Sequence, residues 1–224
     1  MELTEVNMFC KKGLFTIILF FILIIGCAGV PVRPALEENH TVPSGKIEGS
    51  QFIGFRYPFN VSVPPHWEMT MEFPDFLEEL GYEKPSPTDK EQTELYIFNP
   101  VTQSSILIDL TPAPPNAEFS QELQNSRVTR VAGSLVDELR EDHGKDLKIE
   151  MGPTEPVSLK GVQYAAIKYA TYTLKDGKRE QGWIYGFTEP YQIFILYVIL
   201  EKGGANDRQD IREILDSFEV ILIK

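Results

Sequence analysis

Cysteine is nearly absent from this chain. The sequence holds only two, Cys10 and Cys27, and both lie near its amino terminus. If residues 1–26 are removed and the Cys27 thiol is modified, no free thiol is left. Disulfide bridges, cysteine-ligated zinc and a cysteine nucleophile would then all be excluded.

Basic side chains are also scarce, since 21 Lys and Arg residues stand against 33 Asp and Glu residues, a formal net charge of −12. Proteins that bind nucleic acid neutralise phosphates with clustered Lys and Arg, so we expect no nucleic-acid partner. An anionic membrane surface would repel the chain as well. Any attachment to a membrane is therefore expected to come from an anchor and not from a basic patch.

The longest apolar run covers residues 14–25 and follows the basic pair Lys11 and Lys12. A membrane-spanning helix needs about 20 predominantly apolar residues, and Pro31, Arg33 and Pro34 close off this stretch before that length is comfortably reached. A basic segment, a short apolar segment and then small residues are the order found in a secretory signal. The run therefore predicts export.

The end of this run, Ile24-Ile25-Gly26-Cys27, resembles the lipobox of bacterial lipoproteins. The resemblance implies that residues 1–26 are a signal peptide and that Cys27 becomes the first mature residue, with a diacylglyceryl thioether and commonly a third acyl chain. Two or more chains anchor a protein stably. In a Gram-negative cell, Ala28 would imply sorting to the outer membrane. An ordinary signal peptide with a coincidental cysteine and an uncleaved anchor helix are the alternatives.

The start of translation has two candidates, Met1 and Met8. Glu2 and Glu5 are unusual in the amino-terminal segment of a signal, which is normally basic. A start at Met8 removes both of them and leaves the compact basic segment Met-Phe-Cys-Lys-Lys-Gly. Amino-terminal sequencing of the uncleaved precursor distinguishes the two starts.

Residues 27–50 are predicted to form a flexible tether, because they combine several Pro and Gly residues with almost no apolar periodicity. A coil of this length spans on the order of 26 Å root-mean-square. That distance is enough to lift a small domain clear of the lipid headgroups. Residues 51–224 suit one domain with a substantial core.

Strands are indicated by runs of β-branched and aromatic residues that end at turn residues. These runs cover residues 52–57, 59–63, 95–98, 106–110, 147–151, 162–174, 180–188 and 193–200, with a last short strand after Phe218. Asp176-Gly177 predicts a two-residue hairpin between two of them. The run at 193–200 is apolar throughout, as expected for a strand covered on both faces.

Three segments have helical spacing. A short helix is predicted at residues 73–80, with Gly81 as its stop. A long one carries an apolar stripe from Val128 to Leu139 and ends before Gly144. A third follows Gly203-Gly204, with Asn206 and Gln209 as a capping pair. The fold class is therefore α+β, an antiparallel sheet with helices packed on both faces.

Two motifs resemble the PsbP-like family, an α/β/α sandwich. Gly54-Phe55-Arg56-Tyr57-Pro58 runs into Val63-Pro64-Pro65-His66-Trp67, like the family's aromatic hairpin before a tryptophan. Ile214-Leu215-Asp216-Ser217-Phe218 precedes the last strand, as in the family. The resemblance covers about residues 51–223 and implies a PsbP-like fold. It also implies an assembly, stabilising or binding module in place of an enzyme, but fold alone supplies no function.

One candidate metal site is His66, Glu68 and Glu72. In a strand these side chains would share a face, but Glu72 would lie more than about 13 Å from Glu68 by the strand rise. That separation is too long for one ion. We therefore interpret them as surface residues beside a buried Trp67 and expect no metal site.

The other candidates also favour structural roles. His143 is predicted at a helix end, where it suits the helix dipole, and His40 lies in the tether. Ser134 lacks the flanking glycines of a nucleophile elbow. Asp207 and Asp210 would repel an anion from the helix after Gly203-Gly204. Five aromatic residues are expected in the core: Tyr57, Trp67, Tyr172, Trp183 and Tyr185. Four carboxylates are expected on an exposed helix face: Asp137, Glu138, Glu141 and Asp142. Asn39 and Asn60 match the acceptor pattern for N-glycosylation.

These observations predict a cell-envelope lipoprotein, anchored through Cys27, whose domain binds an envelope protein partner without catalysis. No catalytic residue, cofactor or metal is assigned, and no small molecule is named. A small-ligand carrier is the alternative and would require a well-formed pocket between the sheet and a helix. A hydrolase or metal enzyme is a third hypothesis and would require converging titratable groups.

Overall fold

The computed structural model describes residues 42–86, 93–115 and 118–221. The residues of the predicted signal and lipobox, including Cys10 and Cys27, lie outside the described part of the chain, as do Asn39 and His40. Within that part, no helix is long and apolar enough to cross a membrane.

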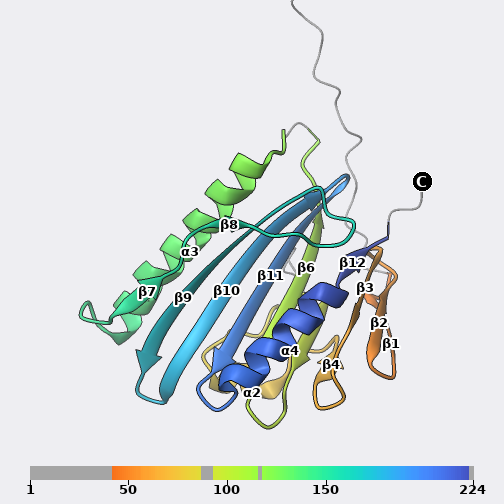
Figure 1. Ribbon diagram of the computed structural model, residues 1–224. Coiled ribbons are helices and arrows are strands. Elements are labelled where there is room, and N and C mark those ends of the chain that lie inside the picture. Colours follow the sequence, from red (N-terminus) through yellow and green to blue (C-terminus); the bar gives the residue numbers. More distant parts are fainter. Residues whose placement is uncertain (1–41, 87–92, 116–117, 222–224) are drawn as a thin grey trace, which may run out of the picture. The chain divides into compact units, whose positions relative to one another are not determined.

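The larger of two antiparallel sheets has the strand order β4-β5-β6-β11-β10-β9-β7, and β8 also pairs with β9 (Figure 1). Its strands are β4 (Glu68–Thr70), β5 (Leu95–Phe98), β6 (Ser105–Pro112), β7 (Ile149–Met151), β8 (Glu155–Pro156), β9 (Tyr164–Leu174), β10 (Gly177–Thr188) and β11 (Tyr191–Leu200). The smaller sheet has the order β1-β2-β3-β12 and comprises β1 (Gly45–Glu48), β2 (Gln51–Gly54), β3 (Phe59–Ser62) and β12 (Glu219–Val220).

The long strands of the larger sheet are those that the sequence predicts. β9 and β10 form a hairpin in which Leu174 pairs with Gly177, so the loop is Lys175-Asp176. The predicted hairpin is present, but its loop begins one residue earlier than Asp176-Gly177. Gly177 opens β10 with a φ of +132°, a conformation that glycine adopts readily.

Three short strands depart from the sequence prediction. β1 lies in the segment assigned to the tether and pairs with β2 from Gly45–Gly54 to Glu48–Gln51. The folded part of the chain therefore begins before residue 51. β4 and β8 were not predicted at all. All three strands are too short to show a period, and hydrogen bonds to a neighbouring strand hold them in place.

Three helices are described: α2 (Asp75–Glu79), α3 (Gln121–His143) and α4 (Gly204–Ser217). The side chain of Ser120 caps α3 by accepting a hydrogen bond from the backbone N–H of Leu123. α4 has Gly203 at its N-cap and no side-chain cap. The predicted Asn206–Gln209 capping pair is therefore wrong, because the helix begins earlier and Gln209 instead hydrogen-bonds Glu213 one turn on.

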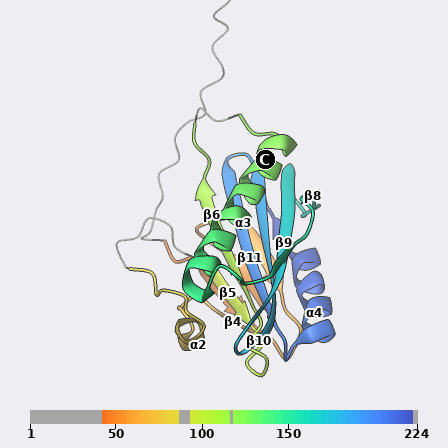
Figure 2. The ribbon, with the colours of Figure 1, turned by 90° about the vertical axis from the view of Figure 1, so that its left-hand side faces the viewer.

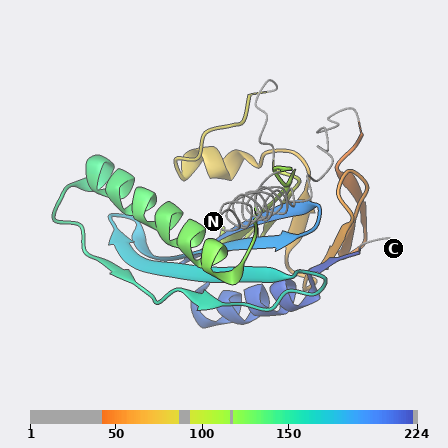
Figure 3. The same ribbon diagram turned by 90° about the horizontal axis from the view of Figure 1, so that it is seen from above.

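Side chains of the central strands alternate between two apolar clusters. One cluster joins the strands to α3 and contains Val128, Ala132, Ala166, Ala170, Tyr172, Trp183 and Leu196. The other, larger cluster joins them to α4 and to the smaller sheet, and includes Phe52, Phe59, Ile184, Ile195, Ile211, Ile214 and Phe218. α3 and α4 lie on opposite sides of the larger sheet (Figures 2 and 3).

The motifs that suggested the fold pack where the two sheets meet. Tyr57 is buried with its ring edge-on to Tyr191, and Arg56 donates to Glu94 at 2.9 Å. Ser217 donates to the backbone oxygen of Ser62 and accepts from the amide of the same residue. These contacts join the smaller sheet to β11, the start of β5 and the end of α4.

Candidate binding groove

The structure does not assemble the predicted His66, Glu68 and Glu72 group. The His66 ring is turned to Asp210 of α4, with 2.8 Å between its Nε2 and Oδ2. The indole N–H of buried Trp67 donates to the same oxygen at 3.0 Å. In the described part of the chain, no cluster of three or more His, Cys, Asp or Glu side chains could hold a metal ion.

The remaining predicted candidates lie in structural positions. The five aromatic residues expected in the core are buried or partly buried in the two clusters, and the four carboxylates of α3 are exposed. Ser134 lies inside α3 and its hydroxyl donates to the backbone oxygen of Arg130. His143 is the last residue of α3.

The amino-terminal turn of α4 is occupied by its own acidic residue. Asp207 is 2% exposed and accepts hydrogen bonds from the hydroxyl of Thr102 at 2.5 Å and the amide of Asn99 at 3.2 Å. Together with Asp210 and its two donors, Asp207 ties α4 to the β5–β6 loop and to the segment before β4. α4 is thus fixed in position over the sheet.

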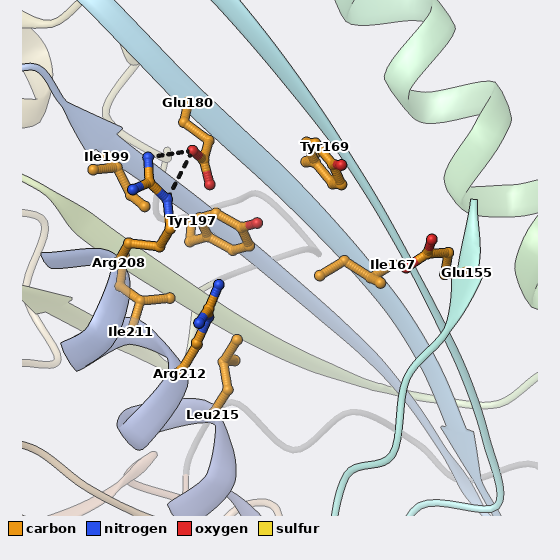
Figure 4. Close-up of a pocket in the computed structure, with 10 residues that line it drawn as sticks. All are labelled: Glu155, Ile167, Tyr169, Glu180, Tyr197, Ile199, Arg208, Ile211, Arg212 and Leu215. Carbon is orange, nitrogen blue, oxygen red and sulfur yellow. Dashed lines mark hydrogen bonds and ion pairs between the residues drawn. The ribbon is translucent and has the colours of Figure 1, made fainter. Parts of the chain in front are cut away.

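Beside α4, the same face of the sheet is hollowed by a groove of about 430 Å³ (Figure 4). α4 packs mainly on β11 and β3, whereas the groove extends over β10 and β9 to β8. Its lining comes from these elements: Glu155, Ile167, Tyr169, Glu180, Tyr197, Ile199, Arg208, Ile211, Arg212 and Leu215.

The floor of the groove is set by one row of residues across three strands. Gly182 of β10 pairs with Tyr197 of β11 on one side and with Tyr169 of β9 on the other. A Cβ atom at residue 182 would lie 2.1 Å from Cζ of Tyr197, so the tyrosine ring leans over the glycine. The Tyr169 ring covers Gly152 instead. Because glycine at residue 182 lets the Tyr197 ring lie over it, and the Tyr169 ring leans the same way toward Gly152, the notch lies between the two rings and not directly above Gly182.

The rim carries two arginines, one turn apart on α4, that differ in their partners. Arg208 donates from Nη2 and Nε to the same carboxylate oxygen of Glu180, at 2.8 and 3.1 Å. Arg212 is exposed and has no hydrogen-bond or ion-pair partner among the described residues. Glu155 stands on the opposite wall, exposed and likewise unpaired within that part of the chain.

The hydroxyl of Tyr197 faces this groove (Figure 4). Burial raises the pKa of the phenol above its ordinary value, and the nearby Glu180 carboxylate acts in the same direction. The side chain therefore stays protonated and can donate a hydrogen bond throughout the physiological pH range.

This groove was not predicted from the sequence. Gly182 sits inside a strand between bulky neighbours, which is a known signal of close approach by another group. Arg208 and Arg212 have the spacing of neighbours on one helix face. These signals could be read from the sequence, but the pairing of Gly182 with Tyr169 and Tyr197 depends on the strand register.

Comparisons with known proteins bear on the fold. No family model and no curated protein matches the chain. Among solved structures it is similar to the cyanobacterial PsbP protein CyanoP from Synechocystis sp. PCC 6803, with a TM-score of 0.52 and 10% identity over 86% of this chain and 100% of that one. It is also similar to LpqN of Mycobacterium tuberculosis, described as involved in cell envelope biogenesis, with a TM-score of 0.47 and 11% identity over 78% and 86% of the two chains.

At these identities a likeness shows the fold and nothing finer. The match to CyanoP spans that whole protein and agrees with the mainly antiparallel sheets and few helices described above. The prediction of a PsbP-like fold is confirmed: this chain folds like cyanobacterial PsbP.

Proposed function

We propose that this protein is a non-catalytic binding protein of the bacterial cell envelope, anchored by lipid on Cys27, and that the groove beside α4 holds a segment of a protein partner. The observation that carries this proposal is the Tyr169–Gly182–Tyr197 row. It leaves an apolar notch between two aromatic rings, on a face where α4 packs mainly against β11 and β3. Aromatic residues around a notch are typical anchors of binding sites.

The charges of the groove favour binding over catalysis. Glu180 is held by two hydrogen bonds from Arg208, so this carboxylate is not poised to take a proton from a substrate. The phenol of Tyr197 is kept protonated by burial, which raises its pKa. The groove presents hydrogen-bond donors, the exposed Glu155 carboxylate and apolar side chains, which are the components of a recognition surface.

A small-ligand carrier is the second candidate, and the size of the groove favours it. A volume of about 430 Å³ lies within the range of roughly 300–1,000 Å³ found for small-molecule sites. Such sites bury most of their ligand, however. Here Tyr169 is 37% exposed and Arg212 and Glu155 are exposed, so a ligand in the groove would keep one side open, as a partner segment does.

The anchor is proposed from the sequence, where Ile24-Ile25-Gly26-Cys27 follows an apolar run. Denatured intact mass of the chain extracted from its own membranes tests it. We expect the mass of residues 27–224 plus acyl groups, and a Cys27→Ser variant that is no longer processed. A wild-type chain without acyl groups that still carries residues before Cys27 would overturn the anchor but not the groove.

Site-specific photocrosslinking tests the groove in native membranes. Tyr169 and Tyr164 lie on the same strand, are 37% and 38% exposed, and point to opposite faces of the sheet because they are an odd number of positions apart. A benzophenone amino acid placed at residue 169 of the full chain should capture a defined partner, whereas the same group at residue 164 should not.

The crosslink must also depend on the groove itself. Leu215→Arg introduces a long charged side chain on the groove wall and should abolish capture at residue 169. Arg130→Glu, at an exposed position of α3, is the control and should leave capture intact. Equal capture at residues 164 and 169, or capture that survives Leu215→Arg, would show that the partner does not bind in the groove.

A further inference from the structure

We propose that the bound segment presents a carboxylate to Arg212 and Tyr197 and seats an apolar side chain in the notch between the rings of Tyr197 and Tyr169. This inference rests on the proposed function and adds the chemistry of the partner. The shared recognition element is an acidic group next to an aromatic or branched aliphatic side chain. An acidic residue inside the segment or a carboxyl terminus can supply it.

Arg212 is the first of two groove residues that can donate to a carboxylate. Arg208, one turn earlier, is neutralised by Glu180 at 2.8 Å, while Arg212 has no such partner in the described ranges. In Figure 4 its guanidinium points along the groove wall toward Tyr197. An unpaired guanidinium beside apolar side chains is a receptor for a carboxylate, which it can hold through two parallel hydrogen bonds.

Tyr197 supplies a second, independent donor. Its side chain is 7% exposed, and its hydroxyl has no hydrogen-bond partner among the residues that the structure describes. Because this hydroxyl faces the open groove, an acceptor atom of a bound molecule can reach it. An anionic oxygen between Arg212 and Tyr197 satisfies both donors.

The opposite wall gives the ligand a direction. Glu155 of β8 is unpaired there within the described part of the chain and lies across the groove from Arg212 (Figure 4). A second carboxylate at that wall would be repelled, and a cationic or amide group would be favoured. The apolar side chain then lies between the two walls, against Ile167, Ile199 and the tyrosine rings.

Two small probes that differ at one group test the carboxylate. N-acetylphenylalanine carries the ring and a carboxylate, and N-acetylphenylalanine amide carries the ring and a neutral carboxamide. Binding to the full chain, held in nanodiscs, is followed through the amide signals of Gly182 and Arg212. We expect the acid to bind about 5-fold more tightly than the amide, as an exposed ion pair with one added hydrogen bond would give.

Two variants assign that difference to the groove. Arg212→Gln should remove the preference for the acid while the amide binds as before, and Arg130→Gln on α3 should change neither. Tyr197→Phe should reduce the preference partly. Equal binding of acid and amide to the wild-type chain, or a preference that survives Arg212→Gln, overturns the carboxylate proposal.

Separate results would refute the peptide source of the carboxylate, the carboxylate itself and the protein partner. Native mass spectrometry of the full chain from its own membranes should show no bound fatty acid. A fatty-acid mass that disappears in Arg212→Gln would overturn the peptide source in favour of a small amphiphile. Loss of the acid preference with an intact crosslink at residue 169 would refute the carboxylate alone, and loss of the crosslink with an intact preference would refute the protein partner alone.

Discussion

The two faces of β9 and β10 carry helices in different ways. On the α3 side, the strands present Ala166 and Ala170 beside Tyr172 and Trp183, and α3 packs directly on them through Val128 and Ala132. On the α4 side, the same strands present Tyr169 and Gly182, and α4 packs mainly on β11 and β3. One face is closed by a helix, and the other keeps a groove.

The difference comes from where the large and small side chains stand. Alanines below α3 let the helix approach, and Trp183 fills the remaining space. Across the α4 face, the small residue is in the middle strand and the two large ones flank it. A helix cannot fill a notch between two rings with its own backbone, but a single inserted side chain can.

The largest effect is expected for Trp183→Ala. Trp183 is 2% exposed, and its removal leaves a cavity between α3 and the sheet that should lower the free energy of unfolding by about 3–5 kcal/mol. Tyr169→Ala on the groove side should lower it by about 1 kcal/mol or less, because that side chain is 37% exposed. Urea denaturation of the two variants measures both values. Equal losses would mean that Tyr169 is a core residue and that the groove face is closed.

A smaller effect is expected for Gly182→Ala. The added methyl would meet the Tyr197 ring at 2.1 Å, so the ring must move and the free energy of unfolding should fall by about 1–3 kcal/mol. Gly133→Ala is the matched control, since nothing lies within 4 Å of a Cβ atom at that exposed position of α3. It should stabilise the chain by about 0.5–1 kcal/mol.

Probe binding is a second measurement on the Gly182→Ala and Gly133→Ala variants. Gly182→Ala should also weaken the binding of N-acetylphenylalanine amide, because the displaced Tyr197 ring narrows the notch between the two tyrosine rings. Gly133→Ala should leave probe binding unchanged. If Gly182→Ala binds the amide as the wild type does, the aromatic ring of the probe does not enter the notch.

Much of the fold could be predicted from the sequence. The long strands, the α3 stripe and the Trp67 and Phe218 motifs are periodic or densely apolar signals, and each is found where expected. β1, β4 and β8 were not predicted because a strand of two to four residues has no period of its own and forms only against a neighbour. The start of α4 escaped because backbone and tertiary contacts, and not a side-chain cap, hold it.

The groove could not be predicted because it is a product of register. Tyr169, Gly182 and Tyr197 are separated by 13 and 15 positions along the chain, and only the pairing of three strands places them in one row. The unpaired state of Arg212 depends in the same way on which arginine reaches Glu180. Sequence patterns find periodic cores, whereas this site consists of one glycine and the residues that strand pairing brings to it.

The smallest effect on stability is expected from removing the hydroxyl groups of two buried tyrosines, one on the α3 side and one on the α4 side of the sheet. The Tyr172 hydroxyl on the α3 side donates to Gln181 at 2.7 Å, so Tyr172→Phe should lower the free energy of unfolding by about 1 kcal/mol at pH 7. Tyr197→Phe should change it by less than about 0.5 kcal/mol, because no described residue bonds that hydroxyl.

At alkaline pH, the two Tyr→Phe substitutions should affect stability in the same direction. Burial raises the pKa of both phenols in the folded chain, so their stabilising contribution is present below the unfolded pKa of about 10 and is lost as the pH rises beyond it. Each Phe variant should therefore lose less stability than the wild type between about pH 9 and about pH 11, which lie on either side of this pKa. A neutral-pH loss for Tyr197→Phe as large as that for Tyr172→Phe would mean that the Tyr197 hydroxyl already has a partner, and Arg212 would then be left as the groove's single donor for a carboxylate.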